Sequence, residues 1–355
     1  MGTTGSLVFA LSADYARRTG GWVYDQQLAD GLAGRGWQVE RLTLPAGFPN
    51  PEPAARAATA AALRALPDGT LLLSDQLCLS VLPDLMAAEA DRLRLVMVLH
   101  HPLAQEGDGR IDRASPFFAG ERNALAAMRL VVATSATTAR TLQETYDVPA
   151  GRIVVAPPGT ERRAAVEPEE EDDVRLTALG ALVPRKDHPA LVAALAGLQR
   201  LPWRLRIVGD TARAPAYVQR LRAQVADSGL ADRILILGEL DDDSLERLWQ
   251  GTDIAVSASR HEGYGMALAE AVARGVPVVT TAAGAVTDWL DGSAARIVPV
   301  GDTAALQAAL AEVIGSDEVR ARLREGALRL RAKLPDWPDT AAAVDAALRR
   351  LVQEG

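Results

Sequence analysis

The stretch from Ile254 to Val279 sets the strongest constraint on how this chain can fold. Its first residues form an apolar run that predicts a strand, and a turn containing Gly263 and Gly265 follows. The Ala-rich segment after Gly265 has the character of a helix that ends at Gly275, and Pro277 opens a second apolar run. A strand, turn, helix and strand in this order is typical of an α/β fold with a parallel sheet.

The turn and the helix start also predict a binding site for an anion. Glycine lets the backbone approach a ligand closely, and the first N–H groups of a helix bind phosphate. Glu262 precedes this site and Glu270 follows it, so the two carboxylates bracket the expected phosphate position. One carboxylate can face what lies before the phosphates and the other what lies after them. A nucleotide sugar has that layout, with its sugar, diphosphate, ribose and base in order.

The segment Glu262-Gly-Tyr-Gly-Met, followed by Glu270-Ala and Gly275-Val-Pro-Val-Val, resembles the signature of retaining glycosyltransferases of family 4, which belong to glycosyltransferase group 1 and have the GT-B fold. The resemblance implies that the donor diphosphate binds to the backbone amides of Gly263, Tyr264, Gly265 and Met266. It also implies that Glu262 contacts the donor sugar and that Glu270 holds the ribose. From the residues alone, the two acids can also be solvated residues on a helix face.

The rest of the chain repeats the alternation of strands and helices, which predicts two doubly wound parallel sheets. We expect a first domain at residues 1–165 and a second at residues 174–337, with the acidic block Glu167–Asp173 as a solvated linker. The resemblance implies two Rossmann-like domains that face each other across a cleft, the GT-B arrangement. It also implies that a helix at residues 338–355, with Thr340 as a possible cap, returns to the first domain.

In the first domain, glycines and histidines follow predicted strands. Gly20 and Gly21 lie in a predicted loop, where turn geometry without a ligand is an equal alternative; the resemblance implies that they face the donor phosphates. His100 and His101 follow an apolar run at Leu95–Leu99, and the end of a strand is where doubly wound sheets place chemistry. The resemblance implies that one of these histidines orients the sugar or the acceptor. Residues 102–118 lack periodicity, which predicts a mobile loop on the acceptor side.

In the second domain, Lys186 matches the position of a lysine in the resembled family, whereas Ala181 stands where the family usually has an arginine. Arg185 is a candidate to supply the missing charge. Cations at this place stabilise the charge that develops on a departing diphosphate. The resemblance also implies that base contacts come from the region of Leu240. The acidic run Asp241–Asp243 is typical of a helix start, and we expect neither a metal nor a cofactor.

Composition limits the remaining possibilities. At 355 residues the chain has room for about two domains, and its net charge of −8 argues against binding to a nucleic acid backbone. We expect a cytoplasmic protein, because no basic leader and no long apolar run occur; contact with a membrane is not indicated. Cys78 is the only cysteine, so a disulfide within the chain is excluded. The scarcity of lysine, with only Lys186 and Lys333, resembles the product of a high-GC bacterial gene.

The sequence therefore predicts a retaining hexosyltransferase-type enzyme (EC 2.4). It would move a sugar from a nucleotide diphosphate sugar to a small-molecule, glycan or lipid-linked acceptor. Family members are usually described as needing no dedicated base. Two alternatives remain: a nucleotide-sugar epimerase of GT-B fold, and a catalytically weak nucleotide-sugar-binding protein, which the alanine at position 181 suggests. A dehydrogenase fits less well, because the first strand is not followed by the glycine fingerprint with an acid about twenty residues later.

Overall fold

The computed structural model describes residues 5–16, 19–167 and 171–353, which form two compact units. Unit 1 comprises Met1–Glu106, Arg110–Gly159 and Pro335–Gly355, and unit 2 comprises Gly107–Gly109 and Thr160–Leu334. Unit 2 thus begins before the acidic block in which we expected the boundary. Residues 168–170 of that block lie outside the described residues.

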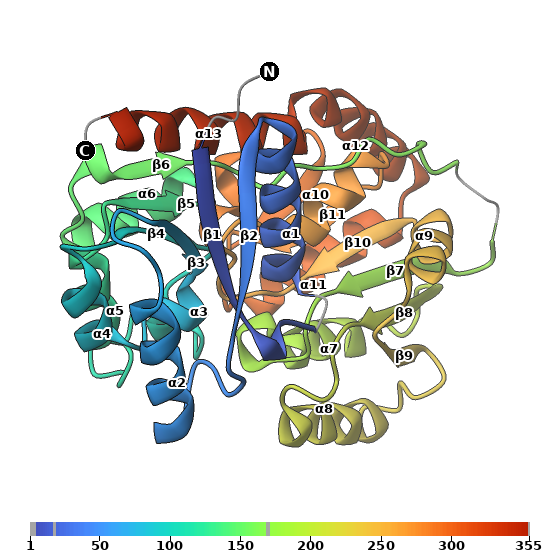
Figure 1. Cartoon of the computed structure of the whole chain (residues 1–355). Coiled ribbons are helices and arrows are strands. Elements are labelled where there is room, and N and C mark those ends of the chain that lie inside the picture. Colours follow the sequence, from blue (N-terminus) through green and yellow to red (C-terminus); the bar gives the residue numbers. More distant parts are fainter. Residues whose placement is uncertain (1–4, 17–18, 168–170, 354–355) are drawn as a thin grey trace. The chain divides into compact units, whose positions relative to one another are not determined.

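Unit 1 is built on a six-stranded sheet whose neighbouring strands are all parallel (Figure 1). The central strands are buried on both faces, whereas the edge strand β2 is buried only at its two end residues. The order across the sheet is β2 (Trp37–Leu44), β1 (Gly5–Ser12), β3 (Leu71–Asp75), β4 (Arg94–Leu99), β5 (Leu130–Ala133) and β6 (Ile153–Val155).

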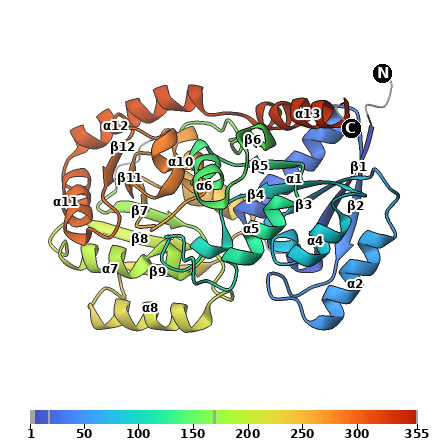
Figure 2. The same ribbon diagram turned by 90° about the vertical axis from the view of Figure 1, so that its left-hand side faces the viewer.

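Two apolar cores in unit 1 cover the two faces of this sheet, as expected for a doubly wound arrangement. The helices that contribute to them are α1 (Gly20–Gly34), α2 (Pro53–Arg64), α3 (Gln76–Leu79), α4 (Pro83–Glu89), α5 (Phe118–Ala126), α6 (Ala136–Tyr146) and α13 (Trp337–Gln353). The C-terminal helix α13 lies beside α1, although more than 300 residues separate them (Figures 1 and 2).

The prediction that Thr340 caps the C-terminal helix is wrong. α13 begins at Trp337, so Thr340 lies inside the helix. Its hydroxyl group donates to the carbonyl oxygens of Pro157, at 2.6 Å, and Asp336, at 3.2 Å. Thr340 therefore ties α13 to the chain just after β6 instead of capping a helix end.

Unit 2 holds a second six-stranded parallel sheet. Apolar cores again lie on both of its faces, so the prediction of two doubly wound parallel sheets is confirmed. The order across the sheet is β12 (Ala295–Val298), β11 (Val278–Thr281), β10 (Ile254–Ser257), β7 (Val174–Leu179), β8 (Trp203–Val208) and β9 (Ile234–Gly238).

The helices of unit 2 continue the predicted alternation of strands and helices. Those that lie between strands are α7 (His188–Ala196), α8 (Pro215–Asp227), α9 (Asp242–Gln250) and α10 (Met266–Ala273). Two more, α11 (Thr303–Ile314) and α12 (Asp317–Leu330), follow the last strand. Asp302 and Ser316 cap these two helices by accepting backbone N–H groups, so a local signal for both helix starts is present in the sequence.

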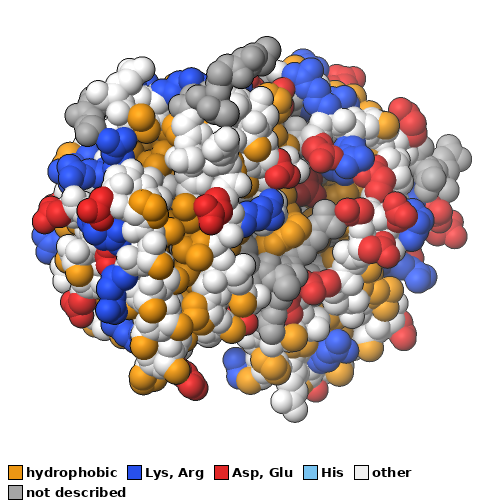
Figure 3. All heavy atoms as spheres, in the orientation of Figure 1, with side chains coloured by type: hydrophobic (Ala, Val, Ile, Leu, Met, Phe, Trp, Pro, Cys, Tyr) orange, Lys and Arg blue, Asp and Glu red, His pale blue; other side chains and the backbone are white. Residues whose placement is uncertain are grey.

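Short 3-10 helices complete the chain, and most of them lie next to strand ends. They are Ala13–Ala16, Leu103–Gln105, Ala150–Arg152, Pro184–Lys186, Gly284–Asp288 and Arg331–Lys333. Within residues 5–16, 19–167 and 171–353, no helix is both long and apolar enough to cross a membrane. On the face shown in Figure 3, basic and acidic side chains are interspersed rather than gathered by sign.

Candidate functional site

The start of α10 has the geometry expected of an anion site. Gly265 precedes the helix with φ +92°, a backbone conformation that residues other than glycine rarely adopt. The N-cap residue is this glycine, which has no side chain to accept a hydrogen bond from the first turn. The neighbouring helix α9 differs, because the Asp241 carboxylate accepts the N–H of Ser244 at 2.7 Å. The first turn of α10 therefore lacks the side-chain cap that α9 has.

Glu262 lies just before this helix start and is held by three groups of its own unit. Its Oε1 accepts hydrogen bonds from Lys186 Nζ at 2.7 Å and from Ser259 Oγ at 2.6 Å. Its Oε2 lies 3.7 Å from an Arg185 guanidinium nitrogen. The carboxylate is 10% exposed, so the ion pairs are shielded from water.

These neighbours decide the charge of Glu262. Burial, the strongest single influence, favours the neutral acid, but Lys186, Arg185 and Ser259 together outweigh it and lower the pKa of Glu262 to about 2. The side chain is therefore ionised at neutral pH. Lys186 consequently has a fixed counter-ion at the place where we expected a diphosphate and a sugar.

Two glycines at strand ends make room for Lys186. A Cβ atom on Gly180, which has φ +151°, would lie 3.0 Å from Lys186 Cε and 3.1 Å from its Nζ. Gly209 also has φ +151°, and a Cβ there would overlap the carbonyl oxygen of Gly180. The chain therefore packs the end of β8 tightly against the end of β7 and lays Lys186 directly over the backbone. A larger residue at position 180 would displace the Lys186 side chain, and one at position 209 would displace the backbone of Gly180.

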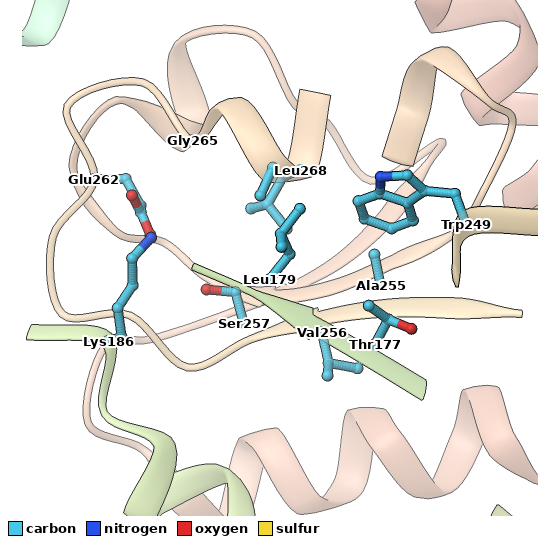
Figure 4. Close-up of a pocket in the computed structure, with 11 residues that line it drawn as sticks. Thr177, Leu179, Lys186, Trp249, Ala255, Val256, Ser257, Glu262, Gly265 and Leu268 are labelled. Carbon is cyan, nitrogen blue, oxygen red and sulfur yellow. The ribbon is translucent and has the colours of Figure 1, made fainter. Parts of the chain in front are cut away.

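A small pocket connects this ion pair with the interior of unit 2. Figure 4 shows Lys186 and Glu262 directed toward each other on one side of it, and Leu179, Leu268 and Trp249 on the other. The remaining lining residues are Thr177, Ala255, Val256, Ser257, Gly265 and Ala267. The pocket thus has a charged end near the start of α10 and an apolar end beneath the same helix.

The second predicted cation has another position. Arg185 is 8% exposed, and its guanidinium donates to the carbonyl oxygen of His261 at 2.7 Å. In this structure the Arg185 side chain contacts the backbone next to Glu262 and the Glu262 carboxylate itself. Arg185 therefore fixes the loop that carries Glu262.

The other predicted donor-side residues lie on or near the same loop. Tyr264 is buried and stacks on Trp289, with ring centroids 5.5 Å apart, and Trp289 Nε1 donates to the Tyr264 carbonyl oxygen at 2.9 Å. Met266 and Glu270 are half-buried in α10, one turn apart, and Leu240 is half-buried on the loop between β9 and α9. Gly263 is half-buried and lacks the positive φ of Gly265.

In unit 1 one expectation requires correction. Gly20 and Gly21 were predicted to lie in a loop, but α1 begins at Gly20, so both residues belong to its first turn. The Thr19 hydroxyl accepts the N–H of Trp22 at 3.2 Å and thereby fixes the helix start before the glycines. The polar cap outweighs the low helix propensity of the two glycines.

The two histidines after β4 have different surroundings. His100 Nε2 lies 3.5 Å from Asp25 Oδ1 and 3.8 Å from Asp75 Oδ2. His101 Nε2 lies 3.1 Å from Glu106 Oε1, a carboxylate that is 26% exposed. Sequence reasoning could not separate the two histidines, whereas the structure distinguishes them by their partners.

The sequence analysis missed several residues around these groups. Ser259 is fully buried against Glu262, and Gly284, with φ +56°, lies so close to the Glu262 carbonyl oxygen that a Cβ would overlap it. A Ser three residues before Glu262 and a Gly after a strand were available as signals, but neither has a motif of its own. Asp75 ends β3, so its place at a strand end was an available signal, whereas Asp25 carried none, because α1 meets β4 only in the folded unit.

The loop after His101 is anchored more firmly than its sequence suggested. Glu121, which is fully buried in α5, accepts the N–H groups of Leu103 at 2.6 Å and Ala104 at 3.1 Å. The same carboxylate accepts the hydroxyl of Tyr146 at 3.1 Å. The expected mobile loop therefore begins with a short 3-10 helix that is bonded to α5.

Comparison with family models gives two matches, which overlap at residues 160–163. The model of glycosyl transferases group 1 matches residues 160–329, and the model of glycosyltransferase family 4 matches residues 19–163. A D-inositol 3-phosphate glycosyltransferase of Xylanimonas cellulosilytica is 30% identical over 241 residues, covering 63% of this chain and 58% of that protein. The chain spans about half the length of the relatives that it matches.

Solved structures share the fold over nearly the whole chain. Sucrose-phosphate synthase from Thermosynechococcus elongatus has a TM-score of 0.82 at 19% identity and covers 99% of this chain and 100% of its own. HepE of Anabaena in complex with UDP-glucose has a TM-score of 0.74 at 17% identity and covers 97% and 99% of the two chains. The two six-stranded parallel sheets are thus those of the GT-B fold.

Proposed function

The chain belongs to the glycosyltransferases of group 1 and family 4, and from this membership we propose that it transfers a sugar, with retention of anomeric configuration, from a nucleoside diphosphate sugar to an acceptor. The observation that carries the proposal is the buried Lys186–Glu262 ion pair beside the start of α10. A helix start without a side-chain cap and a lysine together provide the positive charge that a diphosphate needs.

The geometry suggests how the ion pair takes part. Before the donor binds, Glu262 holds the Lys186 side chain in place. When the diphosphate arrives, Lys186 turns toward the phosphate oxygens, and the Glu262 carboxylate becomes free to accept a hydroxyl of the donor sugar. As the bond between sugar and phosphate breaks, Lys186 and the amides from Gly263 to Met266 stabilise the negative charge on the leaving group. Glu270, one helical turn further on, binds the ribose.

The relatives support a nucleotide sugar as donor without identifying it. HepE, which shares the fold, is described in complex with UDP-glucose, and a lipopolysaccharide core mannosyltransferase of Rhizobium leguminosarum is 34% identical over 37% of this chain and 37% of its own. We therefore propose a hexose as the transferred group. A thermal-shift screen with UDP, GDP, ADP and dTDP identifies the base as that of the nucleotide that raises Tm most. A ligand at 100 times its Kd stabilises the folded state by about 2.7 kcal/mol.

Lysine acetylation tests the proposed role of Lys186 directly. The chain has only two lysines, so Lys333 on the 3-10 helix after α12 is an internal reference. We expect the nucleoside diphosphate chosen by the screen to slow acetylation of Lys186 but not of Lys333, as measured by mass spectrometry. Lys186→Ala should reduce kcat about a hundredfold, whereas Lys333→Ala should leave it unchanged. Equal acetylation of Lys186 with and without nucleotide would contradict the proposal.

The alanine at position 181 keeps a second candidate function open, a nucleotide-sugar-binding protein with weak catalysis. Arg185 does not restore the missing charge in this structure, because its guanidinium binds the His261 carbonyl oxygen and lies against Glu262. Such a protein would bind the nucleotide and protect Lys186, yet show neither transfer nor donor hydrolysis with a panel of acceptors. Turnover of the donor in the absence of an acceptor would instead indicate an epimerase or a hydrolase.

A further inference from the structure

The turn before α10 is hydrogen-bonded to the segment that follows β11. The Glu262 carbonyl oxygen accepts the backbone N–H of Ala285 at 2.9 Å, and the Tyr264 carbonyl oxygen accepts the indole N–H of Trp289 at 2.9 Å. Ala285 belongs to the 3-10 helix Gly284–Asp288, and Trp289 is the residue directly after it. Two carbonyl groups of the turn, two residues apart, therefore point toward one segment of the chain.

Side chains pack at the same place. The ring of Tyr264, which is 6% exposed, stacks on the indole of Trp289 with an angle of 24° between the two ring planes. A Cβ atom on Gly265 would lie 3.2 Å from Val286 Cγ2 and 3.9 Å from Trp289 Cζ2. Val286 is fully buried in the apolar core beneath α10, so the turn packs against a fixed part of unit 2. The indole of Trp289 thus holds the turn through a hydrogen bond and through ring contact.

The direction of these carbonyl groups decides where the next N–H groups point. The peptide bonds after Glu262 and after Tyr264 are trans, and in a trans peptide the C=O and the N–H point in opposite directions. The N–H groups of Gly263 and Gly265 therefore point away from the segment that follows β11. Neither of them donates to a backbone carbonyl in the part of the chain that the structure describes.

Two N–H groups with a common direction suit an anion. The Gly265 N–H lies directly before α10, whose first N–H groups and dipole also attract negative charge. The bond from Trp289 affects the strength of this donor as well as its direction. A carbonyl oxygen that accepts a hydrogen bond polarises its peptide group, so the N–H at the other end of that group becomes a stronger donor.

We propose that Trp289 is a positioning residue, which directs the Gly265 N–H at the diphosphate by holding the Tyr264 carbonyl oxygen from the other end of the peptide group. In this role the indole acts through the peptide between Tyr264 and Gly265 and needs no contact with the ligand. The identity of the anion as the diphosphate of a nucleotide sugar rests on the proposed function. The orientation of the peptide does not.

The indole N–H resonances of the six tryptophans test this coupling in the wild-type protein by NMR. We expect sodium pyrophosphate to shift the resonance of Trp289, because an anion on the Gly265 N–H strengthens the hydrogen bond at the other end of the same peptide. Trp203 is the reference. Its indole N–H donates to the Leu198 carbonyl oxygen at 2.8 Å, at the start of β8, and its resonance should stay in place.

Affinity measurements on variants separate positioning from stabilisation of the fold. Trp289→Phe keeps a ring to stack on Tyr264 but lacks the N–H donor. We expect its Kd for pyrophosphate, and for the nucleoside diphosphate chosen by the screen, to rise about tenfold, whereas the Kd for the corresponding nucleoside stays the same. Trp203→Phe is the matched control, because it loses the same kind of bond. It should lower Tm without changing these Kd values.

The Trp289 resonance is assigned by its loss in Trp289→Phe or in Trp289→Leu, which also lacks the donor and replaces the phenylalanine variant if that one does not fold. An unchanged Kd for pyrophosphate in the folded variant would overturn the proposal. So would a Trp289 resonance that stays in place while calorimetry shows that pyrophosphate binds.

The outcomes also distinguish this proposal from the proposed function. Sugar transfer with equal nucleotide affinity in the wild type and in Trp289→Phe would overturn the positioning role and leave the proposed function standing. Pyrophosphate binding that depends on Trp289, in a protein that transfers no sugar, would support the positioning role while the proposed function fails. A wild type that binds neither pyrophosphate nor any nucleoside diphosphate would overturn both.

Discussion

Each unit holds a mostly buried ionisable side chain surrounded by groups of opposite charge, and the signs of these charges are reversed between the two units. In unit 1 a base, His100, is surrounded by two acids, and in unit 2 an acid, Glu262, is surrounded by Lys186 and Arg185. Burial favours the neutral form of both central groups, yet in each case the flanking charges of opposite sign outweigh it. Burial alone therefore does not determine whether a site residue is charged, because the charges of its neighbours also contribute. A base among acids and an acid among bases give stability that depends on pH with opposite sign.

The largest effect is expected from removing the charge of Glu262. Glu262→Gln leaves Lys186 and Arg185 without their shared counter-ion in a site that is mostly shielded from water. We expect a loss of about 3 to 5 kcal/mol in the free energy of unfolding. Urea unfolding followed by tryptophan fluorescence measures it, and a loss below about 1 kcal/mol would show that the pair is solvated.

The acid dependence of the same pair should be nearly as large. The pKa of Glu262 in the folded state, about 2, is below its ordinary value of 4.5, so its stabilisation is present above pH 4.5 and is lost as the pH falls through about 2. At about 1.4 kcal/mol for each pKa unit, this amounts to roughly 3 kcal/mol. The difference in unfolding free energy between the wild type and Glu262→Gln should therefore shrink between pH 5 and pH 2. A constant difference would contradict the assigned ionisation.

For His100 we expect a smaller effect of opposite sign. Its pKa in the folded state is raised by Asp25 and Asp75 against the effect of burial, so its stabilisation is complete below the ordinary pKa and is lost as the pH rises through the folded-state value. The wild type should exceed His100→Gln in stability at pH 5.5, and this advantage should decline toward pH 9. An advantage that grows with pH would show that the ring is held in its neutral form.

The smallest effect is expected from an exposed pair with good geometry. The Arg296 guanidinium donates to both oxygens of Glu312 at 2.8 Å, but the Glu312 side chain is 44% exposed. Glu312→Gln should cost no more than about 1 kcal/mol in the free energy of unfolding, and less in 0.5 M NaCl. This variant is also the control for Glu262→Gln. If both cost the same, burial does not distinguish the two pairs.

The site in unit 2 was more predictable from the sequence than the site in unit 1. In unit 2, Gly265, Glu262 and Lys186 belong to recognisable local patterns, and the structure brings these three residues together. In unit 1 the glycine pair was misjudged as a loop, because the Thr19 cap that starts α1 competes with the turn propensity of glycine. Asp25 and Asp75 were missed, since each lies in an element that gives no sign of its neighbours across the sheet.

The sequence by itself determined the alternation of strands and helices, the two parallel sheets, and the turn at Gly265 that starts α10, because periodicity and backbone conformation are encoded over a few residues. The tertiary structure alone decided that His100 has two acids beside Nε2, that Arg185 bonds the backbone at His261, and that α13 packs beside α1. These features depend on which strands become neighbours and on which side chains meet at the carboxyl ends of the sheets. Only the folded chain fixes those distances, and with them the charges of the site residues.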